Sequence, residues 1–316
     1  MIILKDIFKI FVSALRPVEK LLIKKQVKID NSRNLPVFII GAPRTGSTLL
    51  YLVIARCWDI SYATNFQNYF NKIPVTGALL SKVFTKPIYK SDWLKSYHGT
   101  TKGLSRPNEF GQFWYNWFPR DRHYVPNGVL TVVQNEQIYK AVSAMISIGK
   151  KPFIFKNMNC GQRIGALSEI FPDAVFLFCR RDPLYTAQSL LLTRESVYKT
   201  RNAWWSIMPK EYEDIIKHQP ERQVVEQVYY IEKQIEEDLV RYYPNRYCQV
   251  HYESLIQDPK RELESIRNYL MEKGVSIKST ENIGDLLIEN GNIKKIDDET
   301  FNKLISLVEE YFGQNK

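Results

Sequence analysis

The sequence of 316 residues contains only four cysteines, at positions 57, 160, 179 and 248. They form no CxxC pair and no cluster with histidine, so their spacing argues against a disulfide framework and against a cysteine–histidine metal site. Three of the four lie in apolar or strand-like surroundings, where we expect reduced side chains of a hydrophobic core. The sequence therefore gives no indication of a metal.

The sequence also lacks a long uncharged apolar run. Its N-terminal segment is apolar, but Lys5, Asp6, Lys9 and Arg16 interrupt it. The longest uncharged stretch is far shorter than the roughly 20 residues that span a bilayer, and no small-residue cleavage site follows it. We therefore expect a cytoplasmic protein in which residues 1–30 form an amphipathic helix. This helix either packs on the domain or lies on the inner face of the membrane.

Positive charge is in excess, because the chain has 44 Lys and Arg against 34 Asp and Glu, a net charge of +10. Such an excess suits nucleic acid, an anionic membrane or a small polyanionic ligand, and it does not choose among them. With 44% hydrophobic residues the chain can bury a large core. Its length fits one large α/β domain as well as two small ones.

One stretch, PVFIIGAPRTGSTLL at residues 36–50, predicts a strand, a loop and the start of a helix. An NSRN turn at residues 31–34 leads into it. Residues 37–40 are too few for a helix before the loop, and their β-branched and aromatic side chains are typical of a buried parallel strand. Ser47 and Thr48 then open an apolar run long enough for three helical turns. The free N–H groups of the first turn would point into the loop and attract an anion.

The loop has the GxxxxG spacing of nucleotide-binding loops between Gly41 and Gly46, but Ser47 replaces the usual lysine. Arg44 supplies a cation instead, and its guanidinium can hold two anionic oxygens. The loop therefore predicts a site for a phosphate or a sulfate. The alternative is a plain strand–turn–helix junction that uses glycine and proline as breakers.

From residue 152 onward, strands and helices alternate. We expect strands at residues 152–155, 174–179 and 247–252, and helices at residues 160–171, 180–191 and 258–270. This alternation predicts an α/β fold with a mostly parallel sheet flanked by helices. Residues 31–316 would form a single domain. Its helical or irregular insertion at about residues 60–150 is rich in aromatic and charged residues and would build the acceptor side of a site.

The loop within residues 36–50 resembles the 5′-phosphosulfate loop of sulfotransferases that use 3′-phosphoadenosine 5′-phosphosulfate (PAPS). The residues that match the family form PRSGTT are Pro43, Arg44, Thr45, Gly46, Ser47 and Thr48. The resemblance implies a P-loop-type fold and PAPS as the sulfuryl donor, with Arg44 and the backbone of residues 45–48 at the 5′-phosphosulfate. It also implies transfer of the sulfuryl group to a hydroxyl without a metal.

A second stretch, FCRRDPLYTAQS, places Arg180 and Arg181 at the carboxyl end of a predicted strand, where ligands bind in open α/β sheets. Taken alone, the two arginines could equally form surface ion pairs. The stretch resembles the 3′-phosphate site of the same sulfotransferases, which use an arginine and a serine at this spacing. The resemblance implies that Arg181 and Ser189 bind the 3′-phosphate.

The same resemblance implies roles for two further residues. Lys156 follows the strand at residues 152–155. In glycan and tyrosyl-protein sulfotransferases a lysine at this place stabilises charge on the transferring group, although a lysine at a strand end is most often merely exposed. The segment HYESLIQDPKRELESIRNYL is similar to a late segment of the family and would bring Tyr252 toward the nucleotide.

The general base does not follow from the resemblance. Tyrosyl-protein sulfotransferases have a catalytic glutamate where this chain has Asn65, and the cytosolic small-molecule enzymes have a histidine where it has Met158. A hydroxyl that attacks sulfur needs a proton acceptor, normally His or Glu. The candidates within the insertion are Glu109 and His98. We favour Glu109, because partial burial beside the aromatic run that follows it would raise its pKa toward neutrality and make it a competent base.

Two other functions stay open. A P-loop kinase or NTPase-like phosphoryl transferase shares the loop, but the loop lysine and a clear magnesium-binding aspartate are missing. A non-catalytic basic module for nucleic acid or membrane would spread its charge along one face, whereas these arginines gather at strand ends, so we expect no nucleic-acid partner. By analogy with bacterial sulfotransferases we expect the acceptor to be a glycan, a lipid-linked sugar or a small molecule. The sequence specifies no oligomeric state.

Overall fold

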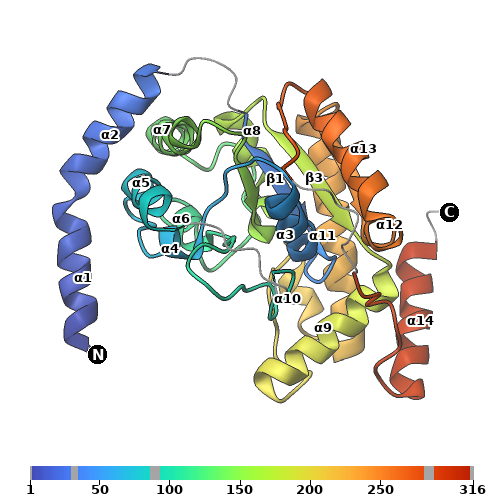
Figure 1. Ribbon diagram of the computed structural model, residues 1–316. Coiled ribbons are helices and arrows are strands. Elements are labelled where there is room, and N and C mark those ends of the chain that lie inside the picture. Colours follow the sequence, from blue (N-terminus) through green and yellow to red (C-terminus); the bar gives the residue numbers. More distant parts are fainter. Residues whose placement is uncertain (1, 30–34, 86–92, 281–287, 314–316) are drawn as a thin grey trace.

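The computed structural model describes residues 2–29, 35–85, 93–280 and 288–313. The turn predicted at residues 31–34 lies outside these ranges. Within them, the sheet has four parallel strands in the order β2-β1-β3-β4 (Figure 1). The strands are β1 (Val37–Gly41), β2 (Ile154–Lys156), β3 (Val175–Arg180) and β4 (Tyr247–His251). The predicted α/β fold with a parallel sheet flanked by helices is confirmed.

The register of the sheet brings three chain segments to one edge. Gly41, the last residue of β1, pairs with Cys179 of β3, and Ile39 pairs with Lys156, the last residue of β2. Because the strands are parallel, the segments that follow β1, β2 and β3 leave the sheet on the same side. This edge is where an open α/β sheet binds its ligands.

Side chains of β1 alternate between two hydrophobic cores, as the two-residue period of a strand requires. Val37 and Ile39 face a core with α3 (Ser47–Cys57), α12 (Tyr252–Gln257) and α13 (Pro259–Glu272). Phe38 and Ile40 face the other core. It includes side chains of α6 (Gly111–Trp114), α7 (Val132–Gly149), α8 (Ile164–Ile170), α9 (Pro183–Tyr198), α11 (Pro220–Tyr242) and α14 (Asp298–Phe312).

The insertion at residues 60–150 is more regular than the sequence suggested. It contains α4 (Asn65–Asn68), α5 (Pro74–Phe84) and α6 before α7. The prediction did not identify α7, although Thr131 and Gln134 form a capping box that marks its start. The aromatic side chains Trp93, Trp114 and Phe118 are buried, so they act as core residues.

Two predicted elements shift in the structure. The strand expected at residues 152–155 begins and ends later, which makes Lys156 a strand residue. The helix expected at residues 160–171 is divided into a 3-10 turn, η1 (Met158–Gln162), and the short α8. By contrast, Asp258 caps α13 as expected, since its side chain accepts a hydrogen bond from the Arg261 N–H (3.0 Å).

The N-terminal segment forms two helices, α1 (Ile2–Ala14) and α2 (Arg16–Ile29), which together make a long arm along one side of the molecule (Figure 1). The α2 helix packs against α5 and α7. The remaining short helix is α10 (Tyr212–Ile215). Among the described helices, none is both long enough and apolar enough to cross a bilayer.

Phe38 offers a test of the packing at the centre of the sheet. Its ring is fully buried and lies 5.5 Å from the Phe155 ring and 5.3 Å from the Phe176 ring, centroid to centroid. We predict that Phe38→Ala lowers the free energy of unfolding by about 3–5 kcal/mol, because it removes a large side chain from a packed core. Urea denaturation measures this. The control, Val132→Ala on the surface of α7, should change it by less than about 0.5 kcal/mol. A loss for Phe38→Ala as small as that of the control would contradict the packing.

Candidate active site

A cavity of about 250 Å³ lies at the carboxyl edge of the sheet. The loop after β1 contributes Arg44, Gly46, Ser47 and Thr48 to its lining; β2 contributes Lys156; the segment after β3 contributes Arg181; and the insertion contributes His98, Gly99 and Glu109. The cavity therefore brings together most of the residues predicted from the sequence. Met158 and Trp205 complete one side of it.

The loop after β1 needs its two glycines because neighbouring chain segments press on it. A Cβ on Gly41 would lie 2.4 Å from the Cys179 carbonyl oxygen, and one on Gly46 would lie 2.5 Å from the Tyr252 ring. Gly46 also has a φ of 82° and directly precedes the first turn of α3. The loop backbone can therefore lie close to Tyr252 while the N-terminus of α3 lines the cavity. Such a terminus attracts anions.

Thr45 differs from its neighbours in the loop. Its side chain is buried, does not line the cavity, and donates a hydrogen bond to the Ala42 carbonyl (2.8 Å). The Ser47 hydroxyl is also turned inward and contacts the Met158 sulfur at 3.4 Å. These two side chains hold the shape of the loop, so any contact that they make with a ligand would come through the backbone.

Arg44 connects the loop with the helix that follows β3. Its Nε donates to the Ser189 hydroxyl (2.9 Å), and its own carbonyl accepts a hydrogen bond from Arg181 Nη1 (3.1 Å). Burial lowers the pKa of the Arg44 guanidinium, and the nearby Arg181 charge lowers it further. Within the described chain, no carboxylate makes an ion pair with either guanidinium. The two cations can therefore share an anion.

A second cavity, of about 320 Å³, adjoins the first, since Arg44, His98 and Arg181 line both. Ser189, Tyr252, Gly291 and Lys295 also line this second cavity. The Arg181 guanidinium lies 4.5 Å above the Tyr252 ring, where it gains a cation–π contact. The two cavities are therefore neighbours, and cationic side chains line both of them.

The C-terminal segment at residues 288–297 is a part of the site that the sequence did not reveal. Arg181 donates to the Asn292 side chain (2.7 Å) and to the Gly291 carbonyl (2.8 Å), while the Gly291 N–H donates to the Tyr252 hydroxyl (2.8 Å). Lys295 adds a further cation to the lining. In the sequence, only Gly291 and the lysine pair Lys294 and Lys295 could have indicated that this segment contributes to a site, and the stretch matches no motif.

The two arginines after β3 have different surroundings. Arg180 makes ion pairs, as the sequence left open, with the buried Glu232 (3.1 Å) and the exposed Glu236 (3.8 Å) of α11. Arg181 turns to the cavity instead. Burial lowers the pKa of the Arg181 guanidinium, although the nearby Tyr252 and Glu253 raise it. Of this pair, only Arg181 is placed for an anionic ligand.

Lys156 and Glu109 form an ion pair at the end of the cavity next to α3. The Lys156 side chain is 3% exposed, whereas that of Glu109 is 41% exposed. Glu109 is partly buried, as expected, but its carboxylate contacts the ammonium of Lys156. Phe110 has a φ of 56° and its ring is buried on Phe113, so the chain reverses between Glu109 and the rings.

Asn65 and Asn157 fix the backbone on either side of Glu109. The Asn157 amide donates to the Glu109 carbonyl (3.0 Å). Asn65 accepts a hydrogen bond from the Asn108 amide (2.7 Å) and donates to the Thr101 and Gly103 carbonyls (both 2.9 Å). Asn65 thus holds the loop that carries His98 and Glu109.

His98 lines both cavities. Its Nε2 is buried and has no hydrogen-bond partner among the described residues. Burial lowers the pKa of the imidazole, and the Arg44 charge lowers it further, so the ring is neutral near pH 7. A neutral imidazole with an unused nitrogen can accept a proton.

Backbone strain is concentrated around the site. Outside glycine, the described residues with positive φ include Arg44 (73°), His98 (47°) and Ser206 (73°), which all line the first cavity. A fourth, Phe110, follows Glu109. Left-handed backbone at non-glycine residues costs energy and occurs often at functional sites. The strained backbone therefore supports the assignment of a functional site to this edge of the sheet.

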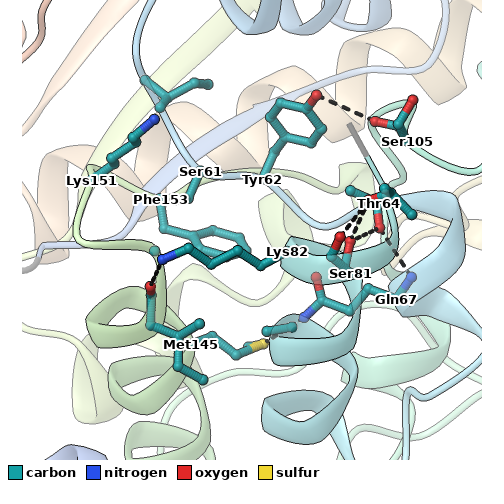
Figure 2. A pocket seen from close by; sticks show the side chains of 15 residues that line it. Ser61, Tyr62, Thr64, Gln67, Ser81, Lys82, Ser105, Met145, Lys151 and Phe153 are labelled. Atoms are coloured by element: carbon teal, nitrogen blue, oxygen red, sulfur yellow. Dashed lines mark hydrogen bonds between the residues drawn. The ribbon is translucent and has the colours of Figure 1, made fainter. Parts of the chain in front are cut away.

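Another cavity, of about 340 Å³, lies at the opposite, amino-terminal end of β2 (Figure 2). Its polar side chains are bonded to neighbouring protein groups. Thr64 pairs with Ser81 (2.8 Å), Lys82 donates to the Ile148 carbonyl (3.2 Å), and Lys151 pairs with Asp59. This cavity takes no part in the candidate site.

Comparisons with known proteins agree with this geometry. Residues 36–273 match the model of the Sulfotransferase family. Sulfotransferase STF9 from Mycobacterium avium has a similar structure, with a TM-score of 0.53, 14% sequence identity, and coverage of 93% of this chain and 72% of that chain. Sulfotransferase STF1 from Mycobacterium tuberculosis gives a TM-score of 0.49 and 14% identity, with coverage of 94% and 82%.

No curated protein matches the sequence significantly. The likeness to STF9 shows a common fold at low sequence identity. The family match covers the strand β1, the loop with Arg44, Lys156, and the segment with Arg181 and Ser189. With three quarters of its length matched, from residue 36 to residue 273, the chain belongs to the sulfotransferase family.

Proposed function

We propose that the protein transfers a sulfuryl group from PAPS to a hydroxyl of an acceptor, which is a glycan, a lipid-linked sugar or a small molecule. The observation that carries the proposal is the contact of Arg44 with Ser189, which joins the loop after β1 to the helix after β3. Arg44 lines both cavities, and cationic side chains line each of them.

The residues present fit a donor with an anionic group at each end. Arg44 and the N-terminus of α3 would hold the 5′-phosphosulfate, while Arg181 and Ser189 would hold the 3′-phosphate. When bound, PAPS would supply an activated sulfuryl group for the acceptor oxygen, with adenosine 3′,5′-bisphosphate as the leaving group. Tyr252, held under Arg181, would lie beside the nucleotide.

Lys156 and Glu109 would act on the reacting atoms. Lys156 is a nearly buried cation at the end of β2, where it would stabilise negative charge that grows on the sulfuryl and bridging oxygens. Glu109, in contact with this ammonium, would accept the proton of the attacking hydroxyl. Because the two side chains are in contact, an acceptor hydroxyl next to Glu109 would also lie next to the sulfuryl group that Lys156 would contact.

His98 is a second candidate for the base, and a specific observation favours it. It is neutral near pH 7 and its buried Nε2 has no partner among the described residues. We place Glu109 first because it contacts Lys156, whereas His98 lies where the two cavities meet, beside Arg44. The two assignments make different predictions for single substitutions.

Phosphoryl transfer from a nucleoside triphosphate has less support. Ser47 stands where a P-loop would have its lysine, and its hydroxyl contacts Met158. Asp182, the carboxylate nearest the end of β3 in sequence, caps α9 by accepting from the Leu184 N–H (2.8 Å). It is therefore engaged at the helix terminus.

The 3′-phosphate assignment can be tested by nucleotide binding. We predict that Arg181→Ala and Ser189→Ala weaken binding of adenosine 3′,5′-bisphosphate by about 10- to 150-fold each, the loss expected for about 1.5–3 kcal/mol per charge-assisted hydrogen bond. Binding of AMP, which lacks the 3′-phosphate, should hardly change. Calorimetric titration measures both. The matched control is Arg180→Gln, whose ion pairs lie on α11. Unchanged affinity of both variants for the bisphosphate would refute the assignment.

The role of Lys156 can be separated from binding. We predict that Lys156→Ala lowers kcat by about 10²–10³-fold, because its charge matters most in the transition state. Affinity for adenosine 3′,5′-bisphosphate should stay within about threefold of the wild type, since that ligand carries no sulfuryl group. Lys151→Ala, at the other end of β2, is the control and should keep full activity. Normal turnover of Lys156→Ala would assign the role to another cation.

The two candidate bases differ in the effect of their removal. We predict that Glu109→Gln lowers kcat by about 10²–10⁴-fold, the typical contribution of a general base, while His98→Asn lowers it by less than about tenfold. Sulfation rates from pH 5 to 9, with nucleotide binding measured in parallel, test this. The acid limb of the wild-type profile should persist in His98→Asn. If that limb disappears with His98→Asn and Glu109→Gln stays active, His98 is the base.

A further inference from the structure

The N-terminal arm of α1 and α2 exposes a stripe of large apolar side chains. The stripe consists of Ile7, Ile10, Phe11, Val18 and Leu21. Their spacing of three, one, seven and three residues keeps them on one face of a nearly continuous helical arm. Ile10 is 70% exposed and Leu21 68% exposed, so these side chains contact water along the length of the arm.

The opposite face of the arm is attached to the domain. Val12 packs with Phe70 and Ile73, and Leu22 and Ile23 pack against the main core. The Glu19 carboxylate accepts hydrogen bonds from the N–H groups of residues 75 and 76 at the start of α5 (both 2.8 Å). These contacts fix the rotation of the arm, so the apolar stripe is held outward by the fold.

The arm that carries the stripe is rich in cations. Residues 2–29 contain seven Lys and Arg but only two Asp and Glu. Lys20, Lys24 and Lys25 are exposed, while Glu19 is occupied by α5. A cavity of about 680 Å³ between the arm and the domain is also lined by Arg16, Lys20 and Lys72, and Glu19 is the one carboxylate in its lining. The arm therefore has a net positive charge, and Lys20, Lys24 and Lys25 are exposed on it.

We propose that this arm seats the protein on the surface of an anionic lipid bilayer. The apolar stripe would enter the boundary between headgroups and acyl chains, and the lysines would contact the lipid phosphates and other anionic headgroups. An exposed apolar face flanked by Lys and Arg is the pattern of interfacial helices. A second copy of the chain fits less well, because it would bring another arm with seven cations and two carboxylates against the first.

Co-sedimentation of the full chain with lipid vesicles tests the proposal, without donor or acceptor present. Wild-type protein should bind vesicles of phosphatidylcholine with phosphatidylglycerol, and should bind phosphatidylcholine vesicles at least about tenfold more weakly. Added salt should reduce the binding. The double variant Phe11→Ser/Leu21→Ser and the triple variant Lys20→Gln/Lys24→Gln/Lys25→Gln should each lose binding at least about tenfold.

The matched control is Val240→Ser, which removes an exposed apolar side chain (56% exposed) from α11 instead of the arm. It should bind anionic vesicles as the wild type does. The proposal is overturned if the wild type does not bind anionic vesicles, if it binds neutral ones equally well, or if both arm variants bind as tightly as the wild type. It is also overturned if light scattering shows a wild-type dimer that Phe11→Ser/Leu21→Ser dissociates while vesicle binding is absent, since the arm would then be a subunit interface.

Discussion

The hydrogen bond from Arg44 to Ser189 holds the candidate site together. Arg44 lies in the loop after β1 and Ser189 lies in α9, so the contact joins two segments 145 residues apart. The left-handed backbone at Arg44, with a φ of 73°, directs its guanidinium along the sheet edge toward α9. A second hydrogen bond, from Arg181 Nη1 to the Arg44 carbonyl (3.1 Å), joins the same loop to the segment after β3.

The placement of Arg44 and Arg181 in this region is electrostatically unfavourable. Arg44 and Arg181 are largely buried, have lowered pKa values, and make no carboxylate ion pairs within the described chain. Their partners are neutral groups, and a partly buried charge without an opposite charge nearby is less stable than one in water. An anionic ligand that contacts both guanidiniums would remove much of this cost. Lys156 lines the first cavity, where it pairs with Glu109, and Lys295 lines the second.

The sequence predicted the fold and much of this site because both depend on local patterns. A buried strand followed by a glycine loop, or by two arginines, places Arg44, Lys156 and Arg181 at strand ends in a parallel sheet. What the sequence missed depends on contacts between distant segments. The partnership of Glu109 with Lys156 spans 47 residues, and the bond of Arg181 to Asn292 spans 111. The orientation of such side chains depends on how distant segments pack together, and the spacing of residues along the sequence does not predict that packing.

The central claim is that this site transfers a sulfuryl group from PAPS to an acceptor hydroxyl. The most direct measurement is transfer of ³⁵S from labelled PAPS to a panel of glycan, lipid-linked sugar and phenolic acceptors, with γ-³²P-labelled ATP offered to the same panel. The account predicts ³⁵S in at least one acceptor, loss of that label with Lys156→Ala, and no ³²P in any acceptor. Transfer of ³²P from ATP without transfer of ³⁵S from PAPS would contradict it.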